Sequence, residues 1–371
     1  MLIQNAKAFI DGKFQEKTDL LIRDGRISAI GTGLAAEGEE LLDLGGDLLL
    51  PGFVDVHIHA FKGMDTMQGE EAVRHMSREL KKVGVAAFLP TTMSASPEDT
   101  VRALAGVKAV MERPEPDGAI VLGAHMEAPF LADAKAGAQL KQYFVDPDEE
   151  NWQRYTGGLE SVVRLITMAP ERAGALAFIS ALTKKGITVS IGHTTADAET
   201  THAAAEAGAT HVTHTFNAQT PLNHRAPGVP GAALVDDRLQ CEVISDGIHL
   251  HPDIVKLIIR TKGKEKLVAI TDAMEAAGMP DGQYQLGGQE VFVHEGAARL
   301  KDGTLAGSTL TMIRAFQNLI RFGATPEEAA LMTTKTPALS IGNEELGEIE
   351  LGAPAIFSRF DENYAFKGTV G

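Results

Sequence analysis

The stretch PGFVDVHIH, residues 51–59, joins a Pro-Gly turn to a short apolar strand that ends in two histidines. Residues two apart on a strand point to the same side, so His57 and His59 are expected to face the same way. Asp55 shares this orientation and is expected to orient a ligand or to fix the start of the strand. Paired histidines at a strand end are typical of a metal site, but an H-x-H pair by itself also fits two histidines packed in a core.

Apolar runs of this kind recur along the chain, with amphipathic stretches between several of them. Residues 96–99, SPED, have the pattern of a helix start, and residues 183–186, TKKG, that of a helix end. Short strands that alternate with helices predict an α/β protein, a (β/α)8 barrel of the TIM type. The predicted strands are Val54–His59, Ala86–Pro90, Ala119–Met126, Val162–Met168, Ile187–Ile191, Thr210–Thr215, Gln240–Ser245 and Leu267–Thr271.

The two ends of the chain lack this alternation and show short strands and turns, among them the candidate strands Leu2–Ile10, Gly347–Leu351 and Ala355–Arg359. We therefore predict a small β-sandwich domain formed from residues 1–52 and 338–371, beside a barrel of residues 53–337. Residues 217–239 contain several prolines and glycines and little periodicity, so they predict a long irregular loop at the barrel rim.

Composition restricts the partners and the compartment. The net charge of -16 at pH 7 argues against a nucleic acid or an anionic membrane as a partner. Cys241 is the only cysteine, which excludes a disulfide within one chain and fits a reducing compartment. The N-terminus has no basic region followed by a long apolar segment, and no apolar run approaches the ~20 residues of a membrane helix. We therefore expect a cytoplasmic protein.

Side chains with metal-ligand chemistry follow several of the predicted strands. Because the carboxyl ends of parallel strands meet at one rim of a barrel, these side chains are expected to converge, as a catalytic divalent metal requires. Asp272, at the end of the eighth run, is suited to accept and return a proton. Glu127 alone also fits a helix cap or a salt bridge, His125 is expected to support the site, and His211 to pack against a helix. The candidate ligands are His57, His59, Glu127, His193, His214 and Asp272.

Further motifs extend this pattern from about residue 51 to about residue 337. They are HMEAPF at 125–130, GHT at 192–194, HTFNA at 214–218, HRAPGVPGA at 224–232, SDGIHLHP at 245–252, TDAM at 271–274 and LAGSTLTM at 305–312. Together with PGFVDVHIH, they resemble the N-acetylglucosamine-6-phosphate deacetylases of the amidohydrolase superfamily. Taken singly, none of these motifs is specific.

The resemblance implies a cofactor and a place for it. His57 and His59 would bind one divalent metal, His193 and His214 a second, and Glu127 would touch both. Zinc and iron both suit such mixed nitrogen and carboxylate ligands. Members of this family that lack the H-x-H pair use one metal, so the pair in this chain favours two.

The resemblance also implies the reaction and the substrate. Asp272 would act as general base and acid in the hydrolysis of N-acetylglucosamine 6-phosphate to glucosamine 6-phosphate and acetate. Part of the phosphate site in this family comes from the neighbouring subunit, which implies a homodimer. The implied substrate-binding residues are Ala138, Gln139, Asn217, Ala218, Arg225, Asp246, His249, Ala306, Gly307 and Ser308.

Departures from the family pattern lie near the substrate and leave alternatives open. Gln139 stands where the family has a histidine that contacts the substrate, and Ala128 replaces a glycine. A different N-acetyl hexosamine phosphate, such as N-acetylgalactosamine 6-phosphate, is therefore an alternative substrate. A cyclic-amide hydrolase would need a lysine at the end of the fourth strand, where the chain reads Thr167-Met168-Ala169. A sugar-phosphate binding protein without catalysis is a third reading, although no expected ligand is missing.

Overall fold

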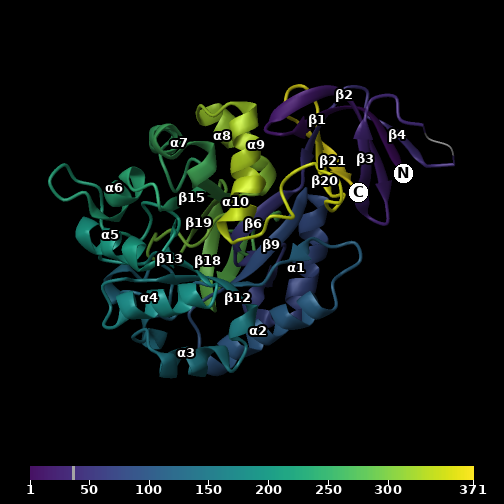
Figure 1. Cartoon of the computed structure of the whole chain (residues 1–371). Helices are drawn as coiled ribbons and strands as arrows, with labels where there is room; N and C mark the ends of the chain where they lie inside the picture. Colours follow the sequence, from purple (N-terminus) through teal and green to yellow (C-terminus); the bar gives the residue numbers. More distant parts are fainter. Residues whose placement is uncertain (36–37) are drawn as a thin grey trace.

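The computed structural model describes residues 1–35 and 38–371 and contains a parallel barrel with a small β-domain at its side (Figure 1). All eight predicted barrel positions hold strands, and the third is filled by two short ones. The barrel strands are β6 (Phe53–Ile58), β9 (Val85–Thr92), β10 (Ile120–Val121), β11 (Ala124–Met126), β12 (Val163–Met168), β13 (Thr188–Ile191), β14 (His211–Val212), β15 (Gln240–Ile244) and β16 (Leu267–Ile270). The predicted fold class is confirmed.

Hydrogen bonds at the carboxyl ends close the barrel between its last and first strands. The backbone N–H of Asp272, just past β16, donates to the carbonyl of His57 in β6 at 2.8 Å. The N–H of His59 donates to the carbonyl of Ala273 at 3.0 Å. The closure therefore places three of the predicted ligands beside one another.

Helices cover the outside of the barrel (Figure 1). The Ser96 hydroxyl accepts from the N–H of Asp99, so α2 starts where the sequence predicts. The helices of the described chain are α1 (Glu70–Lys82), α2 (Pro97–Glu112), α3 (Glu149–Thr156), α4 (Ala175–Lys184), α5 (Ala198–Ala207), α6 (Gly228–Val235), α7 (Pro252–Lys266), α8 (Met312–Phe322), α9 (Pro326–Thr333) and α10 (Lys335–Ser340), with 3-10 turns η1 (Thr66–Gln68), η2 (Asp133–Lys135), η3 (Lys141–Tyr143) and η4 (Glu160–Val162). Among residues 1–35 and 38–371, no helix has the length and apolarity to cross a membrane.

Both chain ends build the small domain, and the two termini lie close together in Figure 1. Its seven strands are hydrogen-bonded in the order β21-β20-β5-β1-β2-β3, with β4 also paired to β1. The sheet is strongly curved, and the N–H of Ile27 in β3 donates to the backbone carbonyl of Ala353, close to β20, at 3.0 Å. Residues from opposite ends of the strand order, such as Ile27 and Phe357, therefore share one apolar core. The strands are β1 (Leu2–Ile10), β2 (Lys13–Arg23), β3 (Arg26–Gly31), β4 (Leu41–Asp43), β5 (Leu48–Pro51), β20 (Phe357–Phe360) and β21 (Phe366–Val370).

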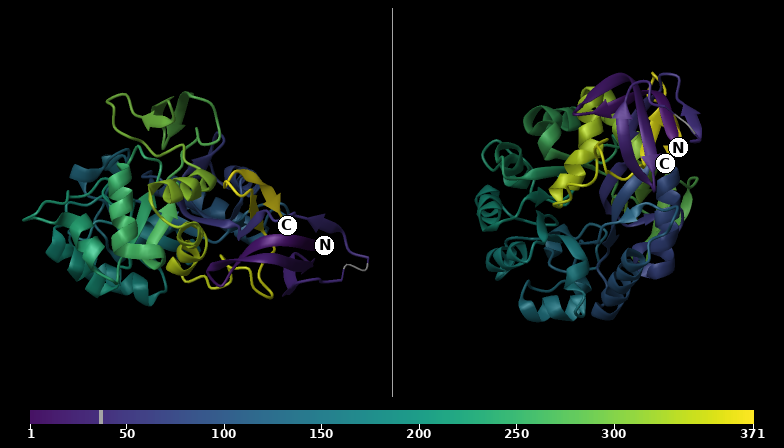
Figure 2. Two further views of the ribbon diagram at one scale, coloured as in Figure 1. Left: turned by 90° about the horizontal axis from the view of Figure 1, so that it is seen from above. Right: turned by 45° about the vertical axis from the view of Figure 1, so that its right-hand side comes forward.

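A three-stranded antiparallel sheet stands above the barrel mouth and was not predicted (Figure 2, left). It consists of β17 (Gly282–Leu286), β18 (Gln289–His294) and β19 (Ala297–Arg299). Gly287 and Gly288 form its two-residue turn, both at positive φ, as tight hairpins require. Its inner side chains pack on Met93 and Met274 at the barrel rim. A second, very short hairpin of β7 (Ala60–Phe61) and β8 (Met64–Asp65) follows the first barrel strand.

Two local predictions from the sequence are wrong. Residues 228–235, inside the segment expected to be irregular, form α6, whose apolar side chains are largely buried. Residues 347–351 form no strand, and the chain bends at Gly347, which is at positive φ. Helix α10 also runs across the expected domain boundary at residues 337/338, and we propose that the barrel ends after it.

Candidate metal centre and substrate pocket

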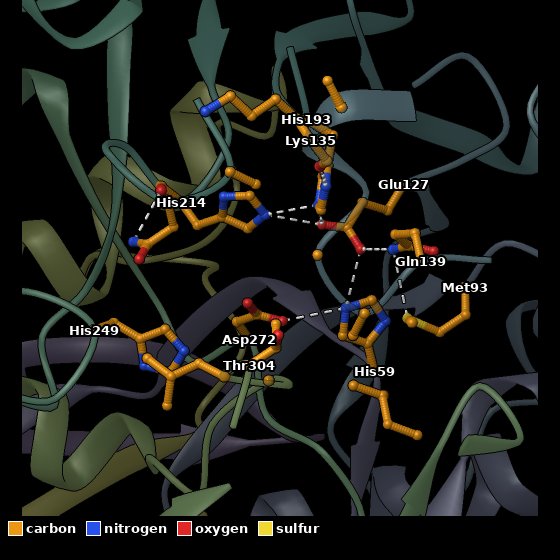
Figure 3. A pocket seen from close by; sticks show the side chains of 18 residues that line it. His59, Met93, Glu127, Lys135, Gln139, His193, His214, His249, Asp272 and Thr304 are labelled. Atoms are coloured by element: carbon orange, nitrogen blue, oxygen red, sulfur yellow. Dashed lines mark hydrogen bonds and ion pairs between the residues drawn. The ribbon is translucent and has the colours of Figure 1, made fainter. Parts of the chain in front are cut away.

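The structure brings the six predicted ligands together at the barrel mouth, where five of them line a cavity of about 320 Å³ and His57 is buried beside Glu127 (Figure 3). Each ligand lies in the last residues of a barrel strand or within two residues of its end. All six side chains are at most 10% exposed. The parallel barrel alone explains this convergence, since it gathers the carboxyl ends of its strands at one rim.

Glu127 lies between two pairs of histidines. Its Oε1 atom is 3.3 Å from the Nε2 atom of His193 and 3.2 Å from that of His214. The same oxygen is 3.4 Å from Nε2 of His57, and its Oε2 atom is 3.2 Å from Nε2 of His59. Figure 3 shows His193 and His214 on one side of the carboxylate and His59 on the other.

The arrangement of nitrogen atoms fits a divalent cation. The Nε2 atoms of His193 and His214 face each other at 3.1 Å, and both point at Glu127. The Nε2 atom of His57 is buried and makes no hydrogen bond with any described residue. Buried imidazole nitrogens that face one another and a carboxylate are a ligand set suited to a divalent metal. The site therefore has the chemistry of a metal centre.

Backbone strain accompanies three of these ligands. His193, His214 and Asp272 have backbone φ values of 45°, 28° and 50°, which residues other than glycine rarely adopt. Each turns the chain sharply just after a strand, and hydrogen bonds such as that from Ser308 N–H to the Asp272 carbonyl, 2.7 Å, hold the turn. Strain of this kind concentrates at functional sites.

The buried charges of the centre depend on one another. Burial disfavours the charged form of His57 and His59, but Asp272 and Glu127 outweigh it, so the pKa of His57 lies well above its usual value and that of His59 rises to about 9. Burial also opposes ionisation of Glu127 and Asp272, but the facing histidines hold the pKa of both carboxyl groups below the usual value. In the metal-free protein, protons on histidines therefore balance the carboxylates, and a bound cation would take their place.

Glu242 supports the centre and was missed in the sequence. It is completely buried in β15, where one carboxylate oxygen is 3.1 Å from Nδ1 of His57 and 3.3 Å from the N–H of His214. This contact makes Nδ1 of His57 the donor and turns Nε2 toward Glu127, as carboxylates commonly do behind metal-binding histidines. A charged residue inside the apolar run Gln240–Ser245 was the available signal.

Two further histidines lie near this region. Nε2 of His125 contacts the Thr167 hydroxyl at 2.8 Å beneath the centre, and the His57 and His125 ring centroids are 4.5 Å apart. Burial holds the pKa of His125 well below its usual value, so it stays neutral. His211 is buried away from the cavity, and burial lowers its pKa to about 4.

The cavity wall contains some of the predicted substrate-binding residues and excludes others. Ala306 and Ser308 are buried behind it, and Ser308 donates its hydroxyl to the Thr271 carbonyl. Asp246 also stands behind the wall, where its carboxylate is 2.7 Å from Nδ1 of His249 and turns that ring toward the cavity. Arg225 lies on an exposed turn outside the cavity. The predicted residues that line the cavity are Ala138, Gln139, Asn217, Ala218, His249 and Gly307.

Sequence reasoning missed several other wall residues. Lys135 lines the cavity, and its backbone carbonyl accepts a 2.7 Å hydrogen bond from Nδ1 of His193. Leu286 comes from the sheet above the barrel mouth, and Thr304 from the segment that follows it. The sheet carries no motif that the sequence analysis singled out, whereas Thr304 directly precedes the motif LAGSTLTM of residues 305–312. The remaining missed residues are Met93, Ala134, Gly137 and Leu305.

Comparison with known proteins identifies this arrangement. Residues 48–368 match the model of the family described as the Amidohydrolase family. The chain belongs to the amidohydrolase family. This amidohydrolase is 37% identical to an N-acetylglucosamine-6-phosphate deacetylase of Lysinibacillus sphaericus, with 100% of this chain and 96% of the relative covered. It is also 37% identical to an N-acetylgalactosamine-6-phosphate deacetylase of Escherichia coli O157:H7, with 91% and 88% covered.

Solved structures agree. The amidohydrolase superimposes on an N-acetyl-D-glucosamine-6-phosphate deacetylase of Mycobacterium smegmatis, solved as a mutant in complex with N-acetyl-D-glucosamine-6-phosphate, with a TM-score of 0.92. The two sequences are 32% identical, and 100% of this chain and 97% of the other are covered. The amidohydrolase is therefore a hydrolase that resembles deacetylases over its full length.

Metal binding by this amidohydrolase should release protons, and the affinity should fall as the pH falls. The pKa of His59 is about 9 in the metal-free protein, so at neutral pH the ring carries a proton that a metal ion at its Nε2 atom must displace. Once the pH exceeds this pKa, the ring is already neutral and the affinity should level off. Calorimetry of Zn²⁺ binding in buffers with different ionisation enthalpies counts the protons released. Binding at neutral pH without proton release would contradict the placement of His59 in the metal centre.

Proposed function

We propose that this chain hydrolyses the N-acetyl amide of N-acetylglucosamine 6-phosphate, giving glucosamine 6-phosphate and acetate. The observation that carries the proposal is the cluster of six buried ligands, five of which line a cavity large enough for a sugar. The deacetylases to which the chain is similar support the choice of substrate. The single, buried cysteine fits the cytoplasm as the place of this reaction.

Two divalent metals per chain, zinc or iron, are part of the proposal. His57 and His59 would hold one and His193 and His214 the other, with Glu127 between them, as the distances to its two oxygens support. A divalent cation bound there polarises an amide carbonyl and lowers the pKa of water to roughly 7. The buried Glu242 would keep His57 in the tautomer whose Nε2 atom is free to bind.

Asp272 is placed to move the proton that hydrolysis requires. Its Oδ1 atom is 3.1 Å from Nε2 of His59, and the side chain borders the cavity. The facing histidines lower the pKa of Asp272 against the effect of burial, so the carboxylate is ionised and ready to accept a proton. In the proposed reaction, water gives a proton to Asp272 and its oxygen bonds to the carbonyl carbon. The C–N bond then breaks as Asp272 returns the proton to the leaving nitrogen.

Recognition of the phosphate requires cations in a strongly acidic protein. Lys135 and His249 line the cavity of the same chain, and Lys135 has no ion-pair partner within 4.0 Å among residues 1–35 and 38–371. Arg225 lies at the exposed turn between Asn223 and Ala226, on a loop that precedes α6 and projects from the barrel (Figure 1). Arg225 does not line the cavity of its own chain. The family resemblance implies a phosphate site shared between subunits, so we propose a homodimer in which Arg225 binds the partner's substrate.

N-acetylgalactosamine 6-phosphate remains the second candidate substrate, because the Escherichia coli relative that acts on it is as similar to this chain as the Lysinibacillus one. A cyclic-amide hydrolase with a bridging lysine is disfavoured. Strand β12 ends at Met168, and the position between the histidine pairs is taken by Glu127.

Asp272→Asn should lower kcat for acetate release by ~10²-fold or more, with the metal content unchanged. The amide has nearly the shape of the carboxylate but cannot accept the proton from water. Acetate release from N-acetylglucosamine 6-phosphate, with elemental analysis of the same sample, measures both quantities. Turnover close to that of the wild type in a fully metal-loaded variant would assign the proton transfer to another residue.

Arg225→Ala should lose most of its activity on the phosphorylated sugar but regain part of it when coexpressed with Asp272→Asn. In a mixed dimer, the Asp272→Asn chain supplies the arginine to a cavity whose own Asp272 is intact. Activity is measured on purified mixed dimers that carry a different affinity tag on each chain. If the arginine served its own cavity, mixed dimers would be as inactive as either parent.

A further inference from the structure

The wall residue that departs from the family pattern, Gln139, has a role that its sequence position did not suggest. We propose that Gln139 is a positioning residue of the metal centre, whose side-chain amide holds the Glu127 carboxylate between the two histidine pairs. The inference rests on the proposed function in one respect, that these histidines and Glu127 bind metal. It assigns the choice between sugar epimers to other residues of the wall.

The orientation of the Gln139 amide follows from its neighbours. Its Oε1 atom accepts a 2.7 Å hydrogen bond from the backbone N–H of Ser94, at the end of the second barrel strand. A backbone N–H can only donate, so the oxygen of the amide faces Ser94 and the NH₂ group faces the other way. On that side it donates to Oε2 of Glu127 at 2.5 Å.

Few conformations are open to this side chain. Gln139 is 5% exposed, and its own N–H donates to the Ala136 carbonyl at 2.9 Å. The neighbouring Leu140 donates its N–H to the hydroxyl of Ser94, which ties the loop to the barrel at a second point. The amide is therefore held at both ends, by the barrel wall on one side and by Glu127 on the other.

The contact acts on the carboxylate oxygen that faces His59. Oε2 of Glu127 has His59 and Gln139 as its neighbours, whereas Oε1 faces His57, His193 and His214. A carboxylate oxygen has two lone pairs, so Oε2 can accept from Gln139 and still direct a lone pair at a cation beside His59. The terminal torsion of a glutamate is soft, and an unheld carboxylate would rotate. Gln139 therefore fixes the oxygen that faces His59, and through it the orientation of the whole carboxylate.

The same contacts leave Gln139 little capacity to recognise a sugar. The oxygen is engaged by Ser94, one N–H by Glu127, and the nitrogen lies 3.5 Å from Sδ of Met93, a weak acceptor. Two of the four hydrogen-bonding positions of the amide are therefore committed to Ser94 and Glu127, and a third faces the thioether of Met93. The replacement of the family histidine by glutamine is thus a change in the support of the metal centre.

The test separates positioning from specificity by measuring both in the same variants. Gln139→Met removes the amide at nearly constant volume, and Gln139→Asn keeps the amide but shortens its reach by one methylene. Competition with a coloured chelator, without substrate, gives the affinity for Zn²⁺. The ratio of kcat/KM for N-acetylglucosamine 6-phosphate to that for N-acetylgalactosamine 6-phosphate gives the specificity, here called the epimer ratio. Gln317→Met is the matched control, since Gln317 is a partly buried glutamine of α8 whose amide bonds only a backbone atom, the Tyr364 carbonyl.

Gln139→Met and Gln139→Asn should each bind the weaker of the two Zn²⁺ ions at least about 10-fold less tightly than the wild type. Their epimer ratio should equal that of the wild type. Gln139→His, which supplies a ring N–H donor at this position, should keep the affinity of the wild type, and Gln317→Met should leave it unchanged. Unchanged Zn²⁺ affinity in both variants, or a shifted epimer ratio, would overturn the proposal. If the wild type binds Zn²⁺ but releases acetate from neither sugar, the proposed function fails, while the chelator measurement still decides the role of Gln139.

Discussion

The buried carboxylate of Glu127 is the constraint around which the barrel mouth is organised. A carboxylate taken out of water costs several kcal/mol unless positive charge and hydrogen bonds compensate it. Four imidazoles and the Gln139 amide surround this one, from four different parts of the chain. Glu242 then fixes one of those imidazoles, and strained backbone at three strand ends keeps the ligands aimed inward. All of these features therefore depend on the negative charge of Glu127.

The division of labour between barrel and loops follows from this constraint. The ligands stand on or next to strands, which hold them rigidly because the barrel core packs independently of the cavity. The cavity wall comes instead from loops and from the sheet β17–β19, which packs on the rim through its own small core. The reaction can therefore stay constant while the wall, and with it the sugar that fits, changes.

Much of this architecture could be predicted because it depends on local patterns. Each barrel strand is an apolar run, and the strand parity that aligned His57 with His59 required no tertiary information. Glu242 was missed because its importance comes from a contact with His57, 185 residues away in the sequence. The hairpin at Gly287-Gly288 alternates polar and apolar residues on a sheet with one exposed face, a weaker signal than a buried strand. The outward position of Arg225 depends on how its loop leaves the barrel, which composition does not determine.

Anomalous X-ray diffraction from crystals grown with Zn²⁺, recorded on both sides of the zinc edge, tests the central claim most directly. We expect two anomalous peaks on opposite sides of the Glu127 carboxylate, one beside His57 and His59 and the other beside His193 and His214. A fully loaded crystal with no peak next to Glu127, or with zinc bound only elsewhere on the protein, would contradict the account.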